Sequence, residues 1–225
     1  MWAREQGCPW DEAVDDEGLD CCLLAAKGGH LEVLRWLRNH GCPWDEWTCA
    51  AAAGGGHLEV LVWARELGCP WDEDLDDPES DCCLRAAKGG HLEVLRWLRG
   101  NDCPWNEWTC AAAAGSGHLE VLVWVREQGC PWGEATWDAA RPYLDLGCCS
   151  SAAEGGHLDV LRWVRDHGCP WDEGTCGQAA GGGHLDVLVW AREHDAPWDV
   201  GFTRRQAERG GHLEVLRWLD DHGAP

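Results

Sequence analysis

The sequence has little of several residue types that most folded proteins use: its 225 residues include one Met, one Phe, one Tyr and no Ile. Lys and Arg are also scarce, 18 against 40 Asp and Glu, which gives a formal net charge of −22. Basic side chains supply most of the affinity for DNA and RNA, and they also attract proteins to anionic membranes. The charge therefore argues against a nucleic-acid or membrane partner and favours a protein partner with a basic or neutral surface.

Long apolar stretches are lacking as well. No run approaches the roughly 20 residues needed to span a bilayer. The N-terminus, MWAREQGCPW, lacks the basic start and apolar stretch of a secretory signal. We therefore expect a cytoplasmic protein (in the host cytoplasm or nucleus if its source is a virus), in a compartment where thiols stay reduced.

Trp, Gly and Cys are abundant instead, with 18, 29 and 15 copies. They belong to a repeated pattern, because GHL recurs seven times at intervals of 27, 34, 27, 39, 27 and 28 residues and CPW keeps step with it. Residues 27–71 and 88–132 align without gaps over 45 positions and differ at seven, which indicates duplication of a two-repeat block. Internal periods of this size are typical of solenoids.

Each repeat is predicted to form two helices. The segment TCAAAA, residues 48–53, consists largely of strong helix formers, and the glycines at 54–56 can close it in the left-handed conformation. A second helix is expected from about His57, with apolar residues mostly three and four apart, until Gly68 and Pro70 end it. The sequence therefore predicts an all-α stack: a half repeat at 1–12, then about seven helix pairs, in a single array over 1–225.

The order AA-x-x-GH-L-E-V-L, followed by a Gly-Cys, resembles the ankyrin repeat, and the resemblance recurs seven times over nearly the whole chain. The style GCPWDEWTCA also resembles ankyrin arrays of giant DNA viruses and some algae. The resemblance implies an ankyrin-like α-solenoid and a structural His in the turn between the helices. Because the 27-residue copies are about six residues shorter than a usual repeat of roughly 33, they are expected to lack the β-hairpin finger. Longer intervals restore a loop in three places.

The tryptophans fall into two registers, one in the second helix and one after the CPW proline, and both are expected in the core. Trp47 and Trp108 differ, because the equivalent position holds Asp81 in another copy, which suggests exposure. Trp137 lies in the longest loop. Exposed aromatic residues are favoured anchors in protein interfaces.

Cys and His could instead indicate a metal site, for example Cys42, Cys49 and His57. Zinc needs four ligands about 2.0–2.3 Å from one ion, whereas equivalent positions of stacked repeats lie roughly 8–10 Å apart. Free Cys commonly acts as a small buried apolar residue. We therefore interpret the cysteines mainly as packing residues, and thiol sensing stays open for the first Cys of each doublet, at 21, 82 and 148.

No recurring Ser–His–Asp arrangement or phosphate-binding loop is present, and the sequence implies no cofactor. The function predicted is that of a non-enzymatic scaffold, which binds a protein through loop tips and, as the resemblance implies, the concave face of the first helices. The alternative is a zinc-binding or thiol-sensing protein. Self-association through an uncapped N-terminal face is a further expectation. The candidate contact residues are Lys27, Trp47, Lys88, Trp108, Trp137, Glu154 and Arg209, with the loop acids Asp15, Asp16, Asp76 and Asp77.

Overall fold

The computed structural model describes residues 21–71, 80–132, 147–171 and 174–222. Within these ranges the chain forms fourteen helices and no β-strand. It divides into two compact units, an N-terminal unit of residues 1–104 and a C-terminal unit of residues 105–225. Each unit is a stack of helix pairs. Because the chain divides into two units, a single continuous array over 1–225 stays a prediction.

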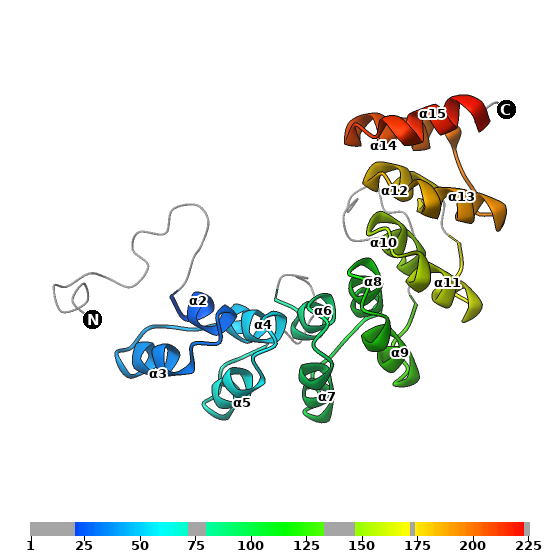
Figure 1. Cartoon of the computed structure of the whole chain (residues 1–225). Helices are drawn as coiled ribbons and strands as arrows, with labels where there is room; N and C mark the ends of the chain where they lie inside the picture. Colours follow the sequence, from blue (N-terminus) through cyan, green and yellow to red (C-terminus); the bar gives the residue numbers. More distant parts are fainter. Residues whose placement is uncertain (1–20, 72–79, 133–146, 172–173, 223–225) are drawn as a thin grey trace. The chain divides into compact units, whose positions relative to one another are not determined.

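Every repeat contains a short first helix and a second helix that begins after GHL (Figure 1). The first helices of the N-terminal unit are α2 (Cys21–Lys27), α4 (Glu46–Gly54) and α6 (Cys82–Lys88), and its second helices are α3 (Leu31–Asn39), α5 (Leu58–Glu66) and α7 (Leu92–Gly100). The first helices of the C-terminal unit are α8 (Glu107–Gly115), α10 (Cys148–Glu154), α12 (Thr175–Gly182) and α14 (Val200–Gly210). Its second helices are α9 (Leu119–Glu127), α11 (Leu158–Asp166), α13 (Leu185–Glu193) and α15 (Leu213–His222).

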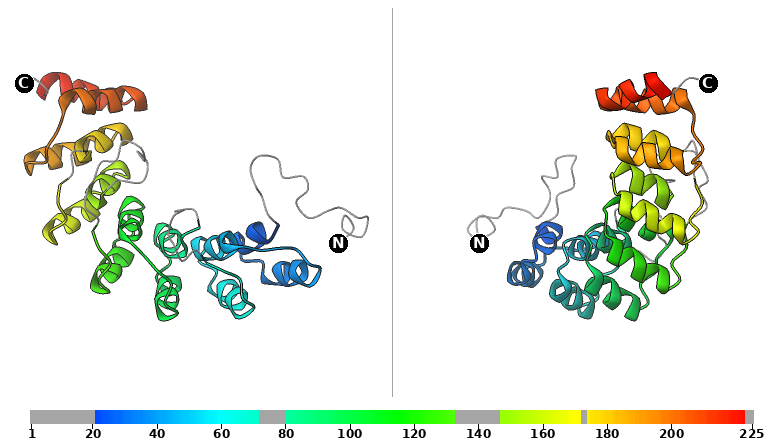
Figure 2. Two further views of the ribbon diagram at one scale, coloured as in Figure 1. Left: turned by 180° about the vertical axis from the view of Figure 1, so that it is seen from behind. Right: turned by 45° about the vertical axis from the view of Figure 1, so that its right-hand side comes forward.

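The first helices pack directly on one another, in the order α2–α4–α6 in one unit and α8–α10–α12–α14 in the other. Figures 1 and 2 show them as one row in each unit, with the second helices as another row beside it. Close packing is possible because the residues between neighbouring first helices are small. Cys49, Ala50 and Ala52 of α4, for example, have no exposed surface. The predicted all-α stack of helix–turn–helix repeats is confirmed.

The turn between the two helices of a repeat follows from its glycines. After α4, the amide of Gly56 donates to Ala53 and the amide of His57 donates to Ala52, at 3.1 and 2.9 Å. Together these two bonds form a Schellman motif, whose penultimate residue must be left-handed. Gly56 has φ +76°, which glycine adopts without steric cost.

The second helix ends in the same way. Gly68 has φ +79°, and the amide of Cys69 donates to Ala64 over 3.0 Å. The side chain of Cys69 is fully buried, as expected for the residue after the left-handed position. The CPW cysteine is therefore a packing residue at a helix end, and Ala196, which replaces it in a later copy, is equally buried.

The short copies turn tightly into the next helix. After Trp44 and Asp45 the chain enters α4 at Glu46 with no finger between α3 and α4, which confirms the fingerless prediction for this connection. The half repeat at 1–12 and most of the three longer loops lie outside the described residues.

One prediction was wrong in degree. The tryptophans of both registers are mostly half-buried, not core; Trp71, at 9% exposure, is the most enclosed of those that the structure describes. They pair across neighbouring repeats, with Trp44 and Trp63 edge to face at 5.7 Å between ring centroids. These pairs bridge neighbouring second helices, which lie farther apart than the first helices do. The rings therefore lie at the outer side of the stack, where they are only half-buried.

Candidate partner-binding surface

A row of variable positions runs along each unit at the ends of the first helices, three residues before each GHL histidine. In the N-terminal unit the row contains Lys27, Gly54 and Lys88, and in the C-terminal unit it contains Gly115, Glu154, Gly181 and Arg209. All the charged members are exposed. We call this set the first-helix row.

The backbone of the first-helix row is fixed by the GHL histidine of the following repeat. The Nε2 atom of His57 lies 3.0 Å from the carbonyl oxygen of Lys27, and His91 contacts Gly54 at the same distance. In the C-terminal unit His212 binds the Gly181 carbonyl at 2.8 Å. Each ring N–H thereby satisfies a carbonyl that the end of the helix leaves without an intrahelical donor, so these histidines are structural.

The glycines of the first-helix row stand close to the next repeat. A Cβ atom at Gly54 would lie 3.3 Å from the Cβ of Arg85, and one at Gly115 would lie 3.2 Å from the Cβ of Ser151. A long side chain therefore alternates with a closely packed glycine. The result is a rigid backbone with charged side chains projecting from every second repeat.

Trp47 and Trp108 lie in the first turns of α4 and α8, where both are half-buried. An Asp in this position does not mark an exposed site, contrary to what the sequence had suggested. Asp81 is only 1% exposed, and its Oδ1 accepts a 2.9 Å hydrogen bond from the amide of Leu84. The position accepts Asp because the carboxylate caps a helix N-terminus, so the exposed edge of each indole is smaller than the sequence suggested.

The remaining candidate contacts fall outside the described residues. These are the loop acids Asp15, Asp16, Asp76 and Asp77, and the loop tryptophan Trp137.

The cysteines form a ladder beside the first helices. Among the described cysteines Cys21 is exposed and the others are buried. The sulfurs of Cys149 and Cys169 lie 3.5 Å apart. No group of three or more His, Cys, Asp or Glu side chains in the described ranges could hold a metal ion.

Hydrogen bonds between thiols divide the ladder into donors and acceptors. Thiol hydrogen bonds from Cys82 and Cys83 lower the pKa of Cys103 to about 5, with Arg99 acting in the same direction. The bond to Cys103, followed by burial, raises the pKa of the Cys82 and Cys83 thiols. Cys103 is therefore the most acidic member of its group, although it is enclosed by protein.

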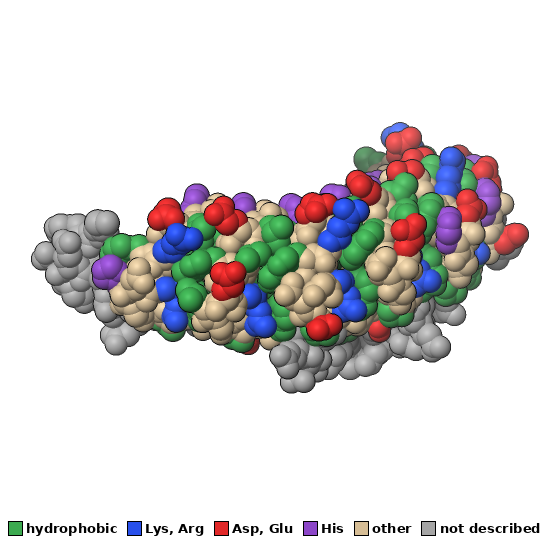
Figure 3. Space-filling model, turned by 90° about the horizontal axis from the view of Figure 1, so that it is seen from below, with side chains coloured by type: hydrophobic (Ala, Val, Ile, Leu, Met, Phe, Trp, Pro, Cys, Tyr) green, Lys and Arg blue, Asp and Glu red, His purple; other side chains and the backbone are tan. Residues whose placement is uncertain are grey.

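Arginine–tryptophan stacking on the second helices is a feature that the sequence analysis missed. The guanidinium of Arg65 lies 3.7 Å from the ring centroid of Trp71 and donates to the Cys69 carbonyl over 2.7 Å. The signal was available, because an Arg precedes the CPW tryptophan by six residues in several copies. Further stacked pairs include Arg38–Trp44, Arg126–Trp132, Arg165–Trp171 and Arg192–Trp198. On the face in Figure 3, basic, acidic and hydrophobic side chains are interspersed.

Comparison with known proteins agrees with this geometry. Residues 22–65 match the family model described as ankyrin repeats (many copies). Over these residues the chain is similar to ankyrin repeats. Among solved structures it is similar to the ankyrin repeat domain of human ASB11, with a TM-score of 0.57 and 15% identity over 79% of this chain and 85% of that one. At that identity the likeness concerns the fold alone. No curated protein sequence matches the chain.

Ankyrin repeats are generally non-enzymatic scaffolds for protein–protein interaction. In the described ranges no helix is long and apolar enough to cross a membrane.

Proposed function

We propose that this protein is a non-enzymatic scaffold that binds a protein partner through its first-helix row. The observation that carries the proposal is the histidine contact to the row, as in His57 to Lys27. A backbone held in place costs little ordering entropy on binding. The exposed side chains on it can differ from repeat to repeat without disturbing the fold, and these differences supply specificity.

The half-buried Trp47 and Trp108 lie at the other end of the first helices and would supply apolar contact area. Tryptophan is enriched among the residues that dominate interface energies. The partner is expected to have a basic or neutral surface, because the chain carries a net charge of −22. The loop acids and Trp137 stay candidate contacts on the grounds of their sequence alone.

Site-specific photo-crosslinking tests the proposal. A crosslinking residue replaces Lys27 or Lys88 in the first-helix row, and Arg35 or Arg96 on the second helices serves as the matched position, because all four side chains are exposed. In a lysate from the natural source, we expect one set of adducts from the row positions that is absent from the second-helix positions. Identical adducts from both sets would contradict the proposal.

A thiol-sensing function is the second candidate, and the Cys149–Cys169 contact is the observation that favours it. Burial of nearly all the described cysteines opposes it, since reactive thiols need access as well as a lowered pKa. Mass spectrometry of the native protein after mild peroxide treatment separates the two functions. Of the first cysteines of the doublets, Cys21 is exposed and Cys82 and Cys148 are buried. Selective oxidation of Cys21, or of Cys149 and Cys169, would support sensing, whereas cysteines that all stay reduced would exclude it.

The zinc form of that candidate predicts stoichiometric metal in the reduced protein and a lower melting temperature in the presence of a chelator. We expect neither result, because equivalent cysteines of stacked repeats do not converge on one point.

Light scattering over a broad concentration range tests the expected self-association through the N-terminal face, and a monomer throughout would count against it. An origin in a giant virus or an alga also stays a prediction.

A further inference from the structure

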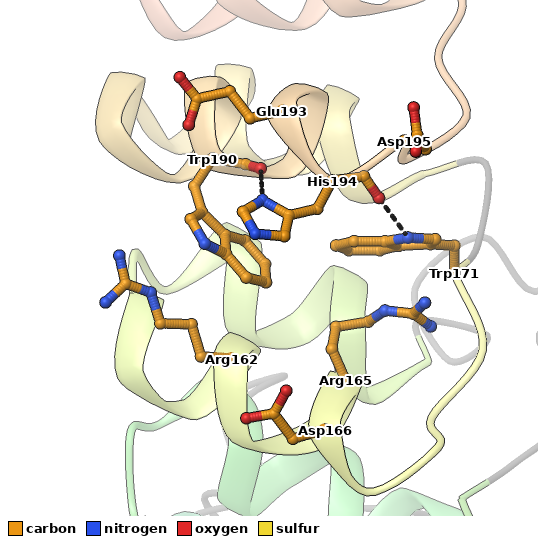
Figure 4. A pocket seen from close by; sticks show the side chains of 8 residues that line it. All are labelled: Arg162, Arg165, Asp166, Trp171, Trp190, Glu193, His194 and Asp195. Carbon is orange, nitrogen blue, oxygen red and sulfur yellow. Dashed lines mark hydrogen bonds between the residues drawn. The ribbon is translucent and has the colours of Figure 1, made fainter.

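An open cavity of about 570 Å³ lies between α11 and α13 in the C-terminal unit (Figure 4). It belongs to the second helices, so it is separate from the first-helix row. The residues that line it are Arg162, Arg165, Asp166, Trp171, Trp190, Glu193, His194 and Asp195.

Two indole rings form the centre of the cavity, and protein contacts hold both. The ring centroids of Trp171 and Trp190 lie 6.0 Å apart. The Nε1 of Trp171 donates to the carbonyl of His194 over 3.2 Å, and the His194 ring stacks on Trp190 at 4.2 Å. Figure 4 shows these rings between the charged side chains. The apolar surface is therefore preorganised and does not have to be ordered by a ligand.

Carboxylates dominate the charge around these rings. Asp166, Glu193 and Asp195 are all exposed, and none of them forms an ion pair with a described residue. Arg165 is already engaged, since it stacks on Trp171 at 4.2 Å and donates to the Cys169 carbonyl. Arg162, 5.7 Å from the Trp190 ring centroid, is the other arginine of the lining. Around the rings stand three carboxylates without an ion pair to a described residue, Asp166 on the α11 side and Glu193 and Asp195 on the α13 side (Figure 4).

Asp195 occupies a position that the repeat normally gives to glycine. Its φ is +60°, and the equivalent residues Gly41, Gly68, Gly129 and Gly168 have φ of +81°, +79°, +85° and +82°. An L-residue in this conformation costs roughly 1–2 kcal/mol. The chain thus carries a carboxylate at the edge of the cavity in spite of a backbone cost.

The equivalent surface between α3 and α5 shows which features are particular to the α11–α13 cavity. It has the same arginines and tryptophans, as Arg35, Arg38, Trp44 and Trp63. However, Asn39 replaces Asp166, Leu67 replaces His194 and Gly68 replaces Asp195. Glu66 corresponds to Glu193, so the framework and this one carboxylate recur, whereas Asp166 and Asp195 have no acidic counterpart between α3 and α5.

We infer that this cavity binds a lysine or arginine side chain from a basic peptide segment of a partner protein. The aliphatic stem lies along the indoles of Trp171 and Trp190, and the cationic head group is placed among the carboxylates of Asp166, Glu193 and Asp195. The net charge of −22 raises the association rate of such a segment. The inference rests on the proposed function in that the chain binds a protein, and it adds a second surface and the chemistry of its occupant.

Titration by NMR tests this inference with a defined probe. The indole N–H resonances of Trp171 and Trp190, assigned with Trp→Phe variants, are followed during addition of acetyl-Gly-Lys-Gly-Lys-Gly-amide. The same peptide with Glu in place of Lys is the anionic counterpart. We expect the lysine peptide to shift these two resonances saturably and the glutamate peptide to leave them in place.

Two triple variants of equal charge then separate the site from the general acidity of the chain. The site variant is Asp166→Asn, Glu193→Gln and Asp195→Gly. The control variant is Glu127→Gln, Glu66→Gln and Asp102→Gly, which changes the corresponding positions of other second helices. At about two- to fivefold for each exposed ion pair, the site variant should raise Kd about tenfold or more, and the control should change it less than about twofold.

The outcomes are distinct. Equal weakening by both variants, or shifts spread over all the indoles, would show only that the lysine peptide is attracted to an acidic protein and would overturn the inference. Binding of the glutamate peptide would assign the cavity to an anion through Arg162 and Arg165 instead. If the site variant loses its dispersed indole spectrum, the comparison of the two peptides on the unaltered protein decides by itself. The crosslinks at Lys27 and Lys88 do not depend on any of these results.

Discussion

The imidazole Nε2 of His91 lies 3.0 Å from the carbonyl oxygen of Gly54, 37 residues earlier in the chain. The contact joins the turn of one repeat to the end of the first helix of the repeat before it. It therefore stabilises the packing of one repeat on the next, and not the pairing of the two helices within a repeat.

Replacing His91 with Ala leaves the Gly54 carbonyl without this donor, which typically costs about 1–3 kcal/mol. We expect the free energy of unfolding to fall by that amount. His40 is a suitable comparison, because it is exposed and contacts its own helix, with Nδ1 2.7 Å from the Trp36 carbonyl. His40→Ala should change stability by about 0.5 kcal/mol or less. Urea denaturation of both variants measures the difference, and equal losses would contradict the interpretation.

Two glycines with nearly the same backbone conformation should differ in their tolerance of alanine. At Gly68 a Cβ atom meets nothing within 4 Å, so Gly68→Ala should cost about 1 kcal/mol from the left-handed backbone alone. At Gly56 the Cβ atom would lie 2.6 Å from Nδ1 of His91. Gly56→Ala should therefore cost at least about 1 kcal/mol more, as measured by the midpoint of urea denaturation. Similar midpoints for the two variants would mean that His91 of the neighbouring repeat moves away from the added methyl group at little cost.

Arg65 should not be replaceable by Lys, although the charge is kept. The flat guanidinium both stacks on Trp71 and donates to the Cys69 carbonyl, and an ammonium group reproduces this geometry poorly. We expect Arg65→Lys to lower stability by about 1 kcal/mol. Arg96→Lys is the control, because Arg96 is exposed and pairs with Glu93. Its effect should stay within about 0.5 kcal/mol, and thermal melts of the two variants test the contrast.

The two aspartates with positive φ should each be improved by glycine. Asp102 has φ +59° and Asp195 has φ +60°. Asp102→Gly and Asp195→Gly should each raise the free energy of unfolding by about 1 kcal/mol, because relief of the left-handed conformation exceeds the entropy that glycine adds to the unfolded chain. The reverse change, Gly168→Asp, should lower it by a similar amount. A loss of stability in Asp195→Gly would show that the carboxylate stabilises the fold.

Local sequence was sufficient to predict the repeat register, the two helices of each repeat and where the helices end. Gly56, Gly68 and the buried Cys69 act within about five residues of the helix they close, so their effect can be derived without knowing what lies beside them. The alanines of α4 likewise predicted a helix, and the resemblance to ankyrin repeats implied that the histidine of the turn is structural.

Other properties depended on distances between repeats, which only the tertiary structure provides. Periodicity placed the tryptophans on the apolar side, but the wider spacing of the second helices leaves them half-buried. Asp81 suggested an exposed position and is instead a buried cap. The cavity between α11 and α13 combines residues of neighbouring repeats. Its acidic groups can form a binding site only because the fold places Trp171 and Trp190 beside each other. Sequence by itself determined the repeat and its helix ends, because these follow from interactions along the chain; the tertiary structure decided which side chains remain accessible to a partner, because that depends on the neighbouring repeat.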